Sequence, residues 1–282
     1  MELDMAMTRR DLGAAIVGLS TISAHAESSQ MNQDKSVTEN SAGDTPAHDM
    51  AAMPAHWMGT EQIAFLIYPG FTALDMVGPH YMLTNLMGAT THIVAKTKEP
   101  VTSDTGLVFT PSATFEECPK ELDILFVPGG TNGTLAAIRD PATLGFVKDR
   151  GQRARFITSV CTGSLVLGAA GLLRGYKATS HWLTLPFLKN LGAIPEAKRV
   201  VIDQNRITGA GVTAGIDFGL FLVAHLRDKD YAEAVQLLAE YDPEPPFNSG
   251  TPQKARPETK EMMDSMFVSF LAEVDALTSK NR

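Results

Sequence analysis

Short, nearly continuous apolar runs recur along residues 60–210, and each is followed by a turn or by a segment with helical spacing. Such runs are typical of strands that are buried on both faces of a sheet. The predicted strands are residues 62–68, 92–96, 123–127 and 155–160. Residues 200–202 and 206–208 predict a hairpin that turns at Gln204 and Asn205.

Segments with apolar residues at helical spacing separate and follow these strands. They predict helices at residues 73–87, 141–152, 163–170, 179–188, 213–226, 232–241 and 257–279. The proline-rich residues 243–252 predict a surface loop. Alternating strands and helices indicate an α/β fold, a mostly parallel sheet flanked by helices on both faces. Because no repeat or second core is evident, residues 60–282 are expected to form a single domain.

The first 26 residues predict an export signal peptide. Arg9 and Arg10 precede a short apolar stretch, and residues 24–26 (AHA) have the small-x-small pattern of a cleavage site. Residues 8–12 (TRRDL) are similar to the twin-arginine signal, which directs folded proteins across the bacterial inner membrane. A general secretory signal is the alternative. The mature protein is therefore expected in the periplasm, with the signal removed.

Residues 27–59 are polar and lack apolar periodicity, which predicts a disordered linker. Several methionines and histidines gather near its end. They are His48, Met50, Met53, His56 and Met58. Thioether and imidazole groups can bind copper(I), but a simple tether is the favoured interpretation.

Composition narrows the function classes. The chain has 282 residues, 44% of them hydrophobic, and a formal net charge of −8. An acidic chain without a basic stripe argues against nucleic-acid binding. After the N-terminus no apolar stretch is long enough for a membrane span. Two cysteines are too few for a disulfide framework. No group of residues has the spacing of metal ligands, and no cofactor is expected.

Candidate functional residues lie where three predicted strands end. These places are residues 74–79 (LDMVGP), 128–130 (PGG) and 160–164 (VCTGS). In open α/β sheets ligands bind outside the carboxyl ends of the strands. The three segments are therefore expected to lie together.

Cys161 stands between a predicted strand and a helix rich in small residues, which is the plan of a nucleophile elbow. The helix N-terminus is expected to lower the pKa of the thiol and favour the thiolate. The alternative is a buried, inert cysteine. Cys118 lies in a polar loop, and a disulfide between the two cysteines is not expected because it would consume the elbow thiol.

Asp75 lies among apolar neighbours after the first predicted strand, where a carboxylate either caps a helix or acts as an acid with a perturbed pKa. If Asp75 lies near Cys161, the acid/base interpretation of Asp75 is favoured. The hydroxyl of Thr162 could bond to substrate or to Asp75.

Four further residues are predicted to line the pocket. They are Gly78, Gly129, Gly130 and His181. The backbone N–H groups of Gly129 and Gly130 could form an oxyanion pocket, although a simple turn is the alternative. His181 either lines the pocket or is a core histidine. Asp217 is interpreted as a structural carboxylate that could also bond to the elbow.

The elbow at residues 159–164, the Asp75-x-x-Gly78-Pro79 segment and residues 127–130 resemble the ThiJ/PfpI superfamily, also called class I glutamine amidotransferase-like. Within it the chain is most similar to the isonitrile hydratases. Residues 104–107, 167–173, 213–219 and 240–247 extend the resemblance over about residues 60–255. Peptidase-like members carry histidine after the cysteine, whereas Thr162 stands there in this chain. The same pattern occurs in regulators of the AraC type, but no helix-turn-helix segment follows.

The resemblance implies a flavodoxin-like fold, a cofactor-free homodimer and hydration of a small isonitrile to an N-substituted formamide through a thioimidate on Cys161. It assigns Cys161 as nucleophile, Asp75 as acid/base and Thr162 as helper. Two other functions stay open. One is a non-enzymatic ligand-binding or cysteine redox-sensing module, and the other is a glyoxalase- or deglycase-like activity on small aldehydes.

Overall fold

The computed structural model describes residues 53–279. The predicted export signal and residues 27–52 of the predicted linker lie outside the described residues. In the described part no helix is long and apolar enough to cross a membrane.

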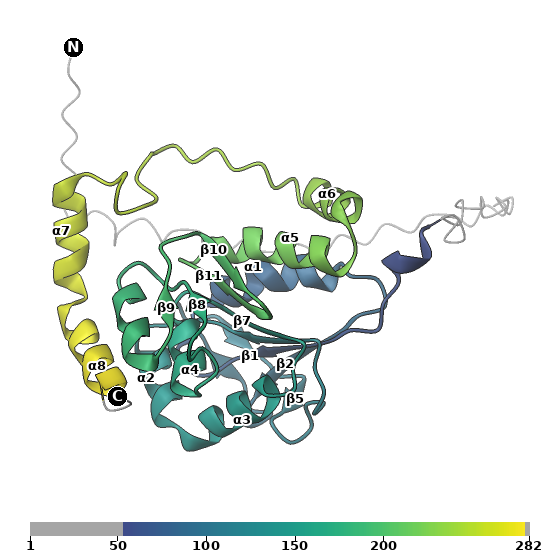
Figure 1. Cartoon of the computed structure of the whole chain (residues 1–282), viewed down its shortest axis with the longest axis horizontal. Helices are drawn as coiled ribbons and strands as arrows, with labels where there is room; N and C mark the ends of the chain where they lie inside the picture. Colours follow the sequence, from purple (N-terminus) through teal and green to yellow (C-terminus); the bar gives the residue numbers. More distant parts are fainter. Residues whose placement is uncertain (1–52, 280–282) are drawn as a thin grey trace, which may run out of the picture. The chain divides into compact units, whose positions relative to one another are not determined.

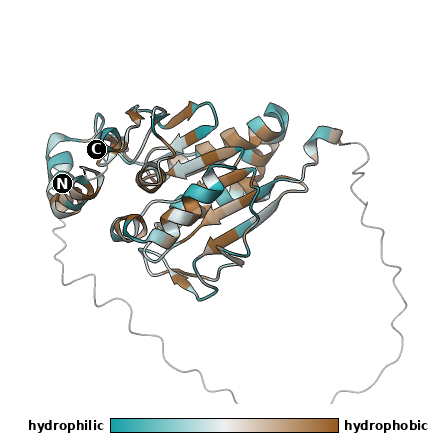
Figure 2. Cartoon of the chain, turned by 60° about the horizontal axis from the view of Figure 1, so that its bottom comes forward, coloured by the Kyte–Doolittle hydropathy of each residue, from teal (hydrophilic) through white to brown (hydrophobic). Residues whose placement is uncertain are grey.

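A seven-stranded sheet forms the centre of the fold (Figure 1). Its strands, in spatial order, are β10 (Val200–Asp203), β11 (Arg206–Gly209), β7 (Phe156–Val160), β6 (Ile124–Val127), β1 (Gln62–Leu66), β2 (Thr90–Ala95) and β5 (Ala113–Thr114). Every neighbouring pair is parallel except the β10–β11 hairpin. The predicted sheet and its hairpin are therefore confirmed. Figure 2 shows the hydrophobic colour concentrated on these strands, because both faces of the sheet are covered.

Helices cover both faces, as predicted (Figure 1). One layer contains α1 (Ala73–Thr84), α5 (Ala214–Leu226) and α6 (Lys229–Leu238). The other contains α2 (Asn132–Arg139), α3 (Pro141–Gly151), α4 (Gly163–Ala169), the 3-10 helix η3 (Leu185–Leu191) and α8 (Val268–Ser279). Two short two-stranded sheets lie outside the main sheet, β3 (Val101–Thr102) with β4 (Val108–Phe109) and β8 (Lys177–Ala178) with β9 (Ile194–Pro195).

Two predicted helices differ from the structure. Residues 179–184 are irregular and η3 begins only at Leu185, because Pro186 has no N–H to donate and its ring obstructs the preceding turn. The single helix predicted at residues 257–279 is divided at Phe267 into α7 (Pro257–Met266) and α8. Helix α2 was missed, since its first residues are the poor helix formers Asn132 and Gly133.

The end of the predicted linker belongs to the domain, so its predicted boundary at residue 59 is wrong. Residues 55–57 form the short helix η2 (Ala55–Trp57), and the Trp57 ring meets Tyr231 edge-on with centroids 5.1 Å apart. Arg227 donates to both carboxylate oxygens of Glu61, at 2.6 and 2.9 Å, and to the Trp57 carbonyl at 2.7 Å. Of the residues considered for copper, His48 and Met50 lie outside the described residues.

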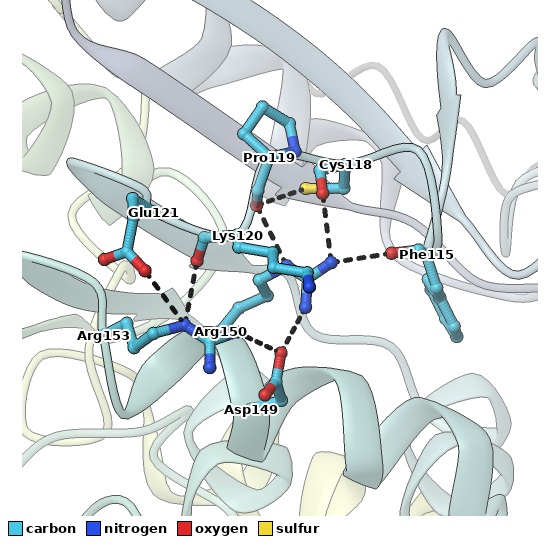
Figure 3. A network of polar contacts seen from close by, with 8 residues as sticks. All are labelled: Phe115, Cys118, Pro119, Lys120, Glu121, Asp149, Arg150 and Arg153. Atoms are coloured by element: carbon cyan, nitrogen blue, oxygen red, sulfur yellow. Dashed lines mark hydrogen bonds and ion pairs between the residues drawn. The ribbon is translucent and has the colours of Figure 1, made fainter.

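A buried arginine fastens one loop to α3 (Figure 3). The guanidinium of Arg150 donates to the backbone carbonyls of Phe115, Cys118 and Pro119 at 2.9 to 3.0 Å. Because the buried cation has these partners and the Asp149 carboxylate, its desolvation is offset. Cys118, whose carbonyl belongs to this network, is a free, buried cysteine.

Helix α4 approaches β6 closely enough to require glycine at its first residue. A Cβ on Gly163 would lie 2.2 Å from the carbonyl oxygen of Val127 and 2.7 Å from that of Pro128. The small residues after Cys161 therefore allow the close contact that the elbow pattern indicated.

Gly163→Ala should lower the free energy of unfolding, because overpacking against backbone typically costs about 1–3 kcal/mol. Gly145→Ala in α3 is the matched control, since nothing lies within 4 Å of an added Cβ there. The control should gain about 0.5–1 kcal/mol from helix propensity. Urea denaturation measures both, and equal stability of the two variants would contradict the close approach.

Candidate functional site

Three neighbouring strands bring the predicted site residues together. Val127 of β6 pairs with Ser159 of β7, and Phe65 of β1 pairs with Phe126 of β6, so these strands end at one edge of the sheet. The loops that follow lead to Asp75, Gly129 and Cys161. The expectation that the three segments meet is confirmed by two hydrogen bonds. The Gly129 N–H donates to Oδ2 of Asp75 at 2.8 Å, and the Gly130 N–H donates to Oγ1 of Thr162 at 2.9 Å.

Cys161 occupies a strained turn. Its φ of 57° lies in the left-handed region that non-glycine residues rarely adopt. The turn is held on both sides. The Cys161 N–H donates to the carbonyl of Ala210 at 2.7 Å, and its carbonyl accepts from the hydroxyls of Ser164 and Ser180 at 3.1 Å. Strain sustained by surrounding bonds is typical of a functional position.

Asp75 lies in the first turn of α1 with no solvent exposure. Its Oδ2 accepts from Gly129, whereas Oδ1 is buried without a hydrogen-bond partner in the described part of the chain. Burial raises the pKa of Asp75 to about 7, and the Gly129 N–H and the Cys161 thiol only partly oppose this shift. The carboxyl group can therefore exchange a proton near neutral pH.

The Cys161 thiol does not have the lowered pKa that the sequence predicted. Burial first, and then the negative charge of Asp75, raise the pKa of Cys161 well above its ordinary value. The Thr162 N–H at the start of α4 opposes this, but α4 has only seven residues. Burial, together with the nearby carboxylate, therefore outweighs the helix dipole, and the prediction of a free thiolate in the resting site is wrong.

The thiol and the carboxyl behave as one acid/base unit. Loss of a proton from either group makes the second loss harder, because two buried negative charges would then lie side by side. The pair consequently holds two protons below about pH 7 and one proton above it. If the proton moves to Asp75, the sulfur becomes an anion without any change in the charge of the site.

The Thr162 hydroxyl is anchored by backbone and by a second threonine. Its Oγ1 accepts from the Gly130 N–H at 2.9 Å and lies 2.7 Å from Oγ1 of Thr134. Tyr68 lies beyond Thr134 and donates to the Pro128 carbonyl at 2.6 Å. Sequence reasoning missed Thr134 and Tyr68, because only the packing of α2 and β1 brings them to this edge.

The predicted oxyanion pocket is not open. The N–H groups of Gly129 and Gly130 already donate to Asp75 and to Thr162. A Cβ on Gly129 would lie 2.8 Å from Oδ2 of Asp75, so glycine is required there for the carboxyl group to approach. Gly78 does not line the site either. It faces Ile216 of α5, where an added Cβ would be 3.1 Å from the side chain.

His181 lies at the border of the site. Its ring faces Gly211. The preceding residue, Ala210, accepts the hydrogen bond from the Cys161 N–H. Burial lowers the pKa of His181, so the imidazole is neutral at neutral pH. Asp217 accepts from Arg199 and from the Tyr241 hydroxyl rather than from the elbow, consistent with a structural carboxylate.

Neither a metal cluster nor a disulfide is found in the described part of the chain. Residues 53–279 hold no group of three or more His, Cys, Asp or Glu side chains that could bind a metal ion. Cys118 and Cys161 are both free, as expected. A cavity of about 440 Å³ lies at the opposite ends of β7 and β11, lined by Lys148 and Arg206 among others, and contains none of the predicted site residues.

The fold and this arrangement agree with a family comparison. The model of the DJ-1/PfpI family matches residues 61–225, more than half of the chain. The chain belongs to the DJ-1/PfpI family. A solved structure of this family, a ThiJ/PfpI protein from Pseudomonas syringae, is 56% identical and superposes with a TM-score of 0.80. The match covers 84% of this chain and 98% of that one.

Two curated relatives represent different uses of the family fold. The isonitrile hydratase of Pseudomonas putida is 51% identical over 194 residues, which are 69% of this chain and 84% of the relative. The HTH-type transcriptional regulator GbdR of Pseudomonas aeruginosa is 28% identical over 67% of this chain. The match spans only about half of the regulator, 53% of its length.

Burial of Asp75 predicts a pH-dependent penalty to stability. The native pKa of about 7 exceeds the ordinary value of 3.8, so the folded state holds its proton more tightly than the unfolded state. The contribution of this proton to the free energy of unfolding is fully present below pH 3.8 and is lost as the pH rises through 7. Asp75→Asn should therefore exceed the wild type in free energy of unfolding at pH 8, by at least about 1 kcal/mol.

The excess should shrink toward pH 4 in denaturation curves recorded across this range. Glu99→Gln, which removes an exposed carboxylate, is the control and should follow the wild-type profile. Parallel profiles for Asp75→Asn and the wild type would show that Asp75 ionises normally in the folded protein.

Proposed function

We propose that this chain is a cysteine-dependent hydratase that converts a small isonitrile, R–N≡C, to the N-substituted formamide R–NH–CHO. The 51% identity to the Pseudomonas putida isonitrile hydratase supports the reaction class. The observation that carries the proposal is the buried Cys161–Asp75 pair, in which the carboxyl group has a pKa of about 7 and an oxygen without a partner.

The first step adds the thiol across the isonitrile carbon. Oδ1 of Asp75 takes the thiol proton as the sulfur attacks the terminal carbon, forming the S–C bond. The protonated Asp75 then delivers the same proton to that carbon. The product is a thioimidate, R–N=CH–S–Cys161, and the carboxylate is restored. No net charge enters or leaves the site, which suits a neutral substrate in a buried setting.

The second step adds water to the thioimidate carbon. Asp75 accepts one water proton and passes it to the substrate nitrogen, which gives R–NH–CH(OH)–S–Cys161. Collapse of this adduct breaks the C–S bond, and the hydroxyl proton returns through Asp75 to the sulfur. The formamide leaves and the thiol–carboxylate pair is regenerated. Thr162, held by Gly130 and Thr134, keeps the loop beside Asp75 in place.

Cys161→Ala should abolish formation of the formamide, because no covalent adduct can form. Asp75→Asn should reduce kcat by at least about 100-fold, since proton delivery to carbon is lost. Cys118→Ala, which removes the other buried cysteine, should retain turnover. Proton NMR of the formyl hydrogen measures all three variants, with circular dichroism to confirm folding.

Intact-mass spectrometry separates this function from the alternatives. Incubation with a small isonitrile, with methylglyoxal and with peroxide tests hydration, aldehyde chemistry and cysteine oxidation in turn. The hydratase proposal would be contradicted by consumption of methylglyoxal without hydration of any isonitrile. Oxidation of Cys161 without any turnover would contradict it as well.

The localisation is also a proposal, which the Arg9-Arg10 motif supports. A double variant, Arg9→Lys with Arg10→Lys, should leave the protein in the cytoplasm of its bacterial host, because the twin-arginine route reads both guanidinium groups. Cell fractionation and immunoblotting measure this. Undiminished appearance of the double variant in the periplasm would favour the general secretory route. We further propose that the mature protein is a homodimer, as the resemblance implies.

A further inference from the structure

The cavity of about 440 Å³ lies at the amino-terminal ends of β7 and β11, beside the C-terminal ends of α3 and α4. Its volume is within the range of about 300–1,000 Å³ that is usual for small-molecule sites. Four residues of β7 separate Ile157, which lines the cavity, from Cys161, which is roughly 13 Å of strand. The cavity is therefore a place distinct from the Cys161–Asp75 pair.

Two cationic side chains line this cavity, and no carboxylate lines it among the described residues. The cations are Lys148 and Arg206, and neither forms an ion pair within residues 53–279. Asp203 pairs with Arg206 in the hairpin, but its carboxylate accepts from the Lys177 N–H instead, at 2.8 Å. The chain has 32 acidic and 24 basic residues, so carboxylate partners are in excess. Two cations at one cavity without such a partner favour an anion there.

The guanidinium of Arg206 is held in place by its neighbours. Its Nε donates to the Leu172 carbonyl at 3.0 Å, and its Nη1 donates to the side-chain oxygen of Asn205. The group also lies over the Tyr176 ring, 4.0 Å from the centroid. Its Nη2 has no hydrogen-bond partner in the part of the chain that the structure describes. Because the side chain is already ordered, a ligand that binds Nη2 pays little conformational entropy.

Neutral donors and an apolar wall complete the lining. Gln152 and Asn205 line the cavity, and neither amide nitrogen has a hydrogen-bond partner within residues 53–279. Since Arg206 donates to the oxygen of Asn205, the nitrogen of that amide remains a donor. The side chains of Ile157 and Leu172 provide apolar surface. This lining suits a molecule with anionic oxygens and a short hydrocarbon part.

The ends of the two helices do not account for the Lys148 side chain. Cations often neutralise unpaired carbonyls at a helix C-terminus. Here the Lys148 carbonyl accepts from the Gln152 N–H at 3.1 Å, and the Leu167 carbonyl of α4 accepts from the Leu172 N–H at 3.0 Å. The ammonium of Lys148 donates to no carbonyl among the described residues, so it is available to a ligand.

We propose that this cavity binds a small organic oxyanion with two negative charges, a dicarboxylate or a phosphate monoester. Nη2 of Arg206 and Nζ of Lys148 hold the charged oxygens, because guanidinium and ammonium groups bind carboxylate and phosphate through short, charge-assisted hydrogen bonds. The amide of Asn205 donates to a further oxygen. The hydrocarbon part lies against Ile157 and Leu172. This assignment does not depend on the hydratase reaction.

Isothermal titration calorimetry at low ionic strength tests the proposal with glutarate and with propyl phosphate. At least one of the two should bind at a single site with a dissociation constant on the order of 1 mM or lower, and the tighter one identifies the anionic group. Glutaramide, which has the same carbon chain without charge, should not bind.

Lys148→Gln should raise the dissociation constant at least about tenfold, because one charge-assisted hydrogen bond is lost. The side chain is exposed and without a polar contact in the described residues, so its replacement does not endanger folding. Lys189→Gln is the matched control, since this exposed lysine lies on η3, outside the cavity, and should leave the affinity unchanged. Arg206→Gln should weaken binding similarly, with circular dichroism to confirm that it is folded.

Four results would overturn the proposal. They are no saturable binding of either anion, equal binding of glutaramide, an unchanged dissociation constant in Lys148→Gln, and equal weakening by Lys189→Gln. Cys161→Ala should bind the anion as the wild type does, and loss of binding in this variant would place the ligand at the candidate site instead. A protein that binds the anion but hydrates no isonitrile would keep the cavity assignment and remove the proposed function.

Discussion

The carboxyl group of Asp75 and the thiol of Cys161 are buried together, and removing both of their protons would place two negative charges in the same dry pocket. Most of the surrounding geometry serves this contact. Gly129 lets the carboxyl group approach and donates to it, and the backbone around Cys161 holds the sulfur in a left-handed turn. The destabilisation from an unsatisfied buried oxygen is consistent with a site that trades stability for reactivity.

Much of this arrangement was predictable from local sequence. Buried parallel strands appear in the sequence as continuous apolar runs, so the order of strands and helices could be predicted from it. Ligands bind at the carboxyl ends of such strands, which predicted that Asp75, Gly129 and Cys161 would meet. The glycine after Thr162 was also informative, because Gly163 is needed where α4 touches the backbone of β6. The apolar runs and Gly163 depend on residues close together in the chain, and the meeting of the three segments follows from a general rule about strand ends.

The failures concern interactions between distant segments. The pKa of Cys161 depends on how deeply the sulfur is buried and how near Asp75 lies, and neither quantity is encoded in the elbow itself. The N–H groups of Gly129 and Gly130 were expected to be free, but partners from α1 and from the start of α4 occupy them. Thr134 gave no signal, because its helix begins with residues that disfavour helices. Trp57 contacts the domain through residues far along the chain, namely Arg227, Asp228 and Tyr231.

The clasp formed by Arg227, Glu61 and Trp57 fixes where the described chain enters the domain. Met87, just beyond the C-terminal end of α1, accepts from the same guanidinium, whereas Asp75 lies at the N-terminal end of that helix. A helix of 12 residues is roughly 18 Å long, so the entry point and the reactive pair are separated by about that distance. An affinity tag or a surface-immobilisation handle joined ahead of Met53 would accordingly attach at a distance from the thiol, leaving it free for kinetic assays.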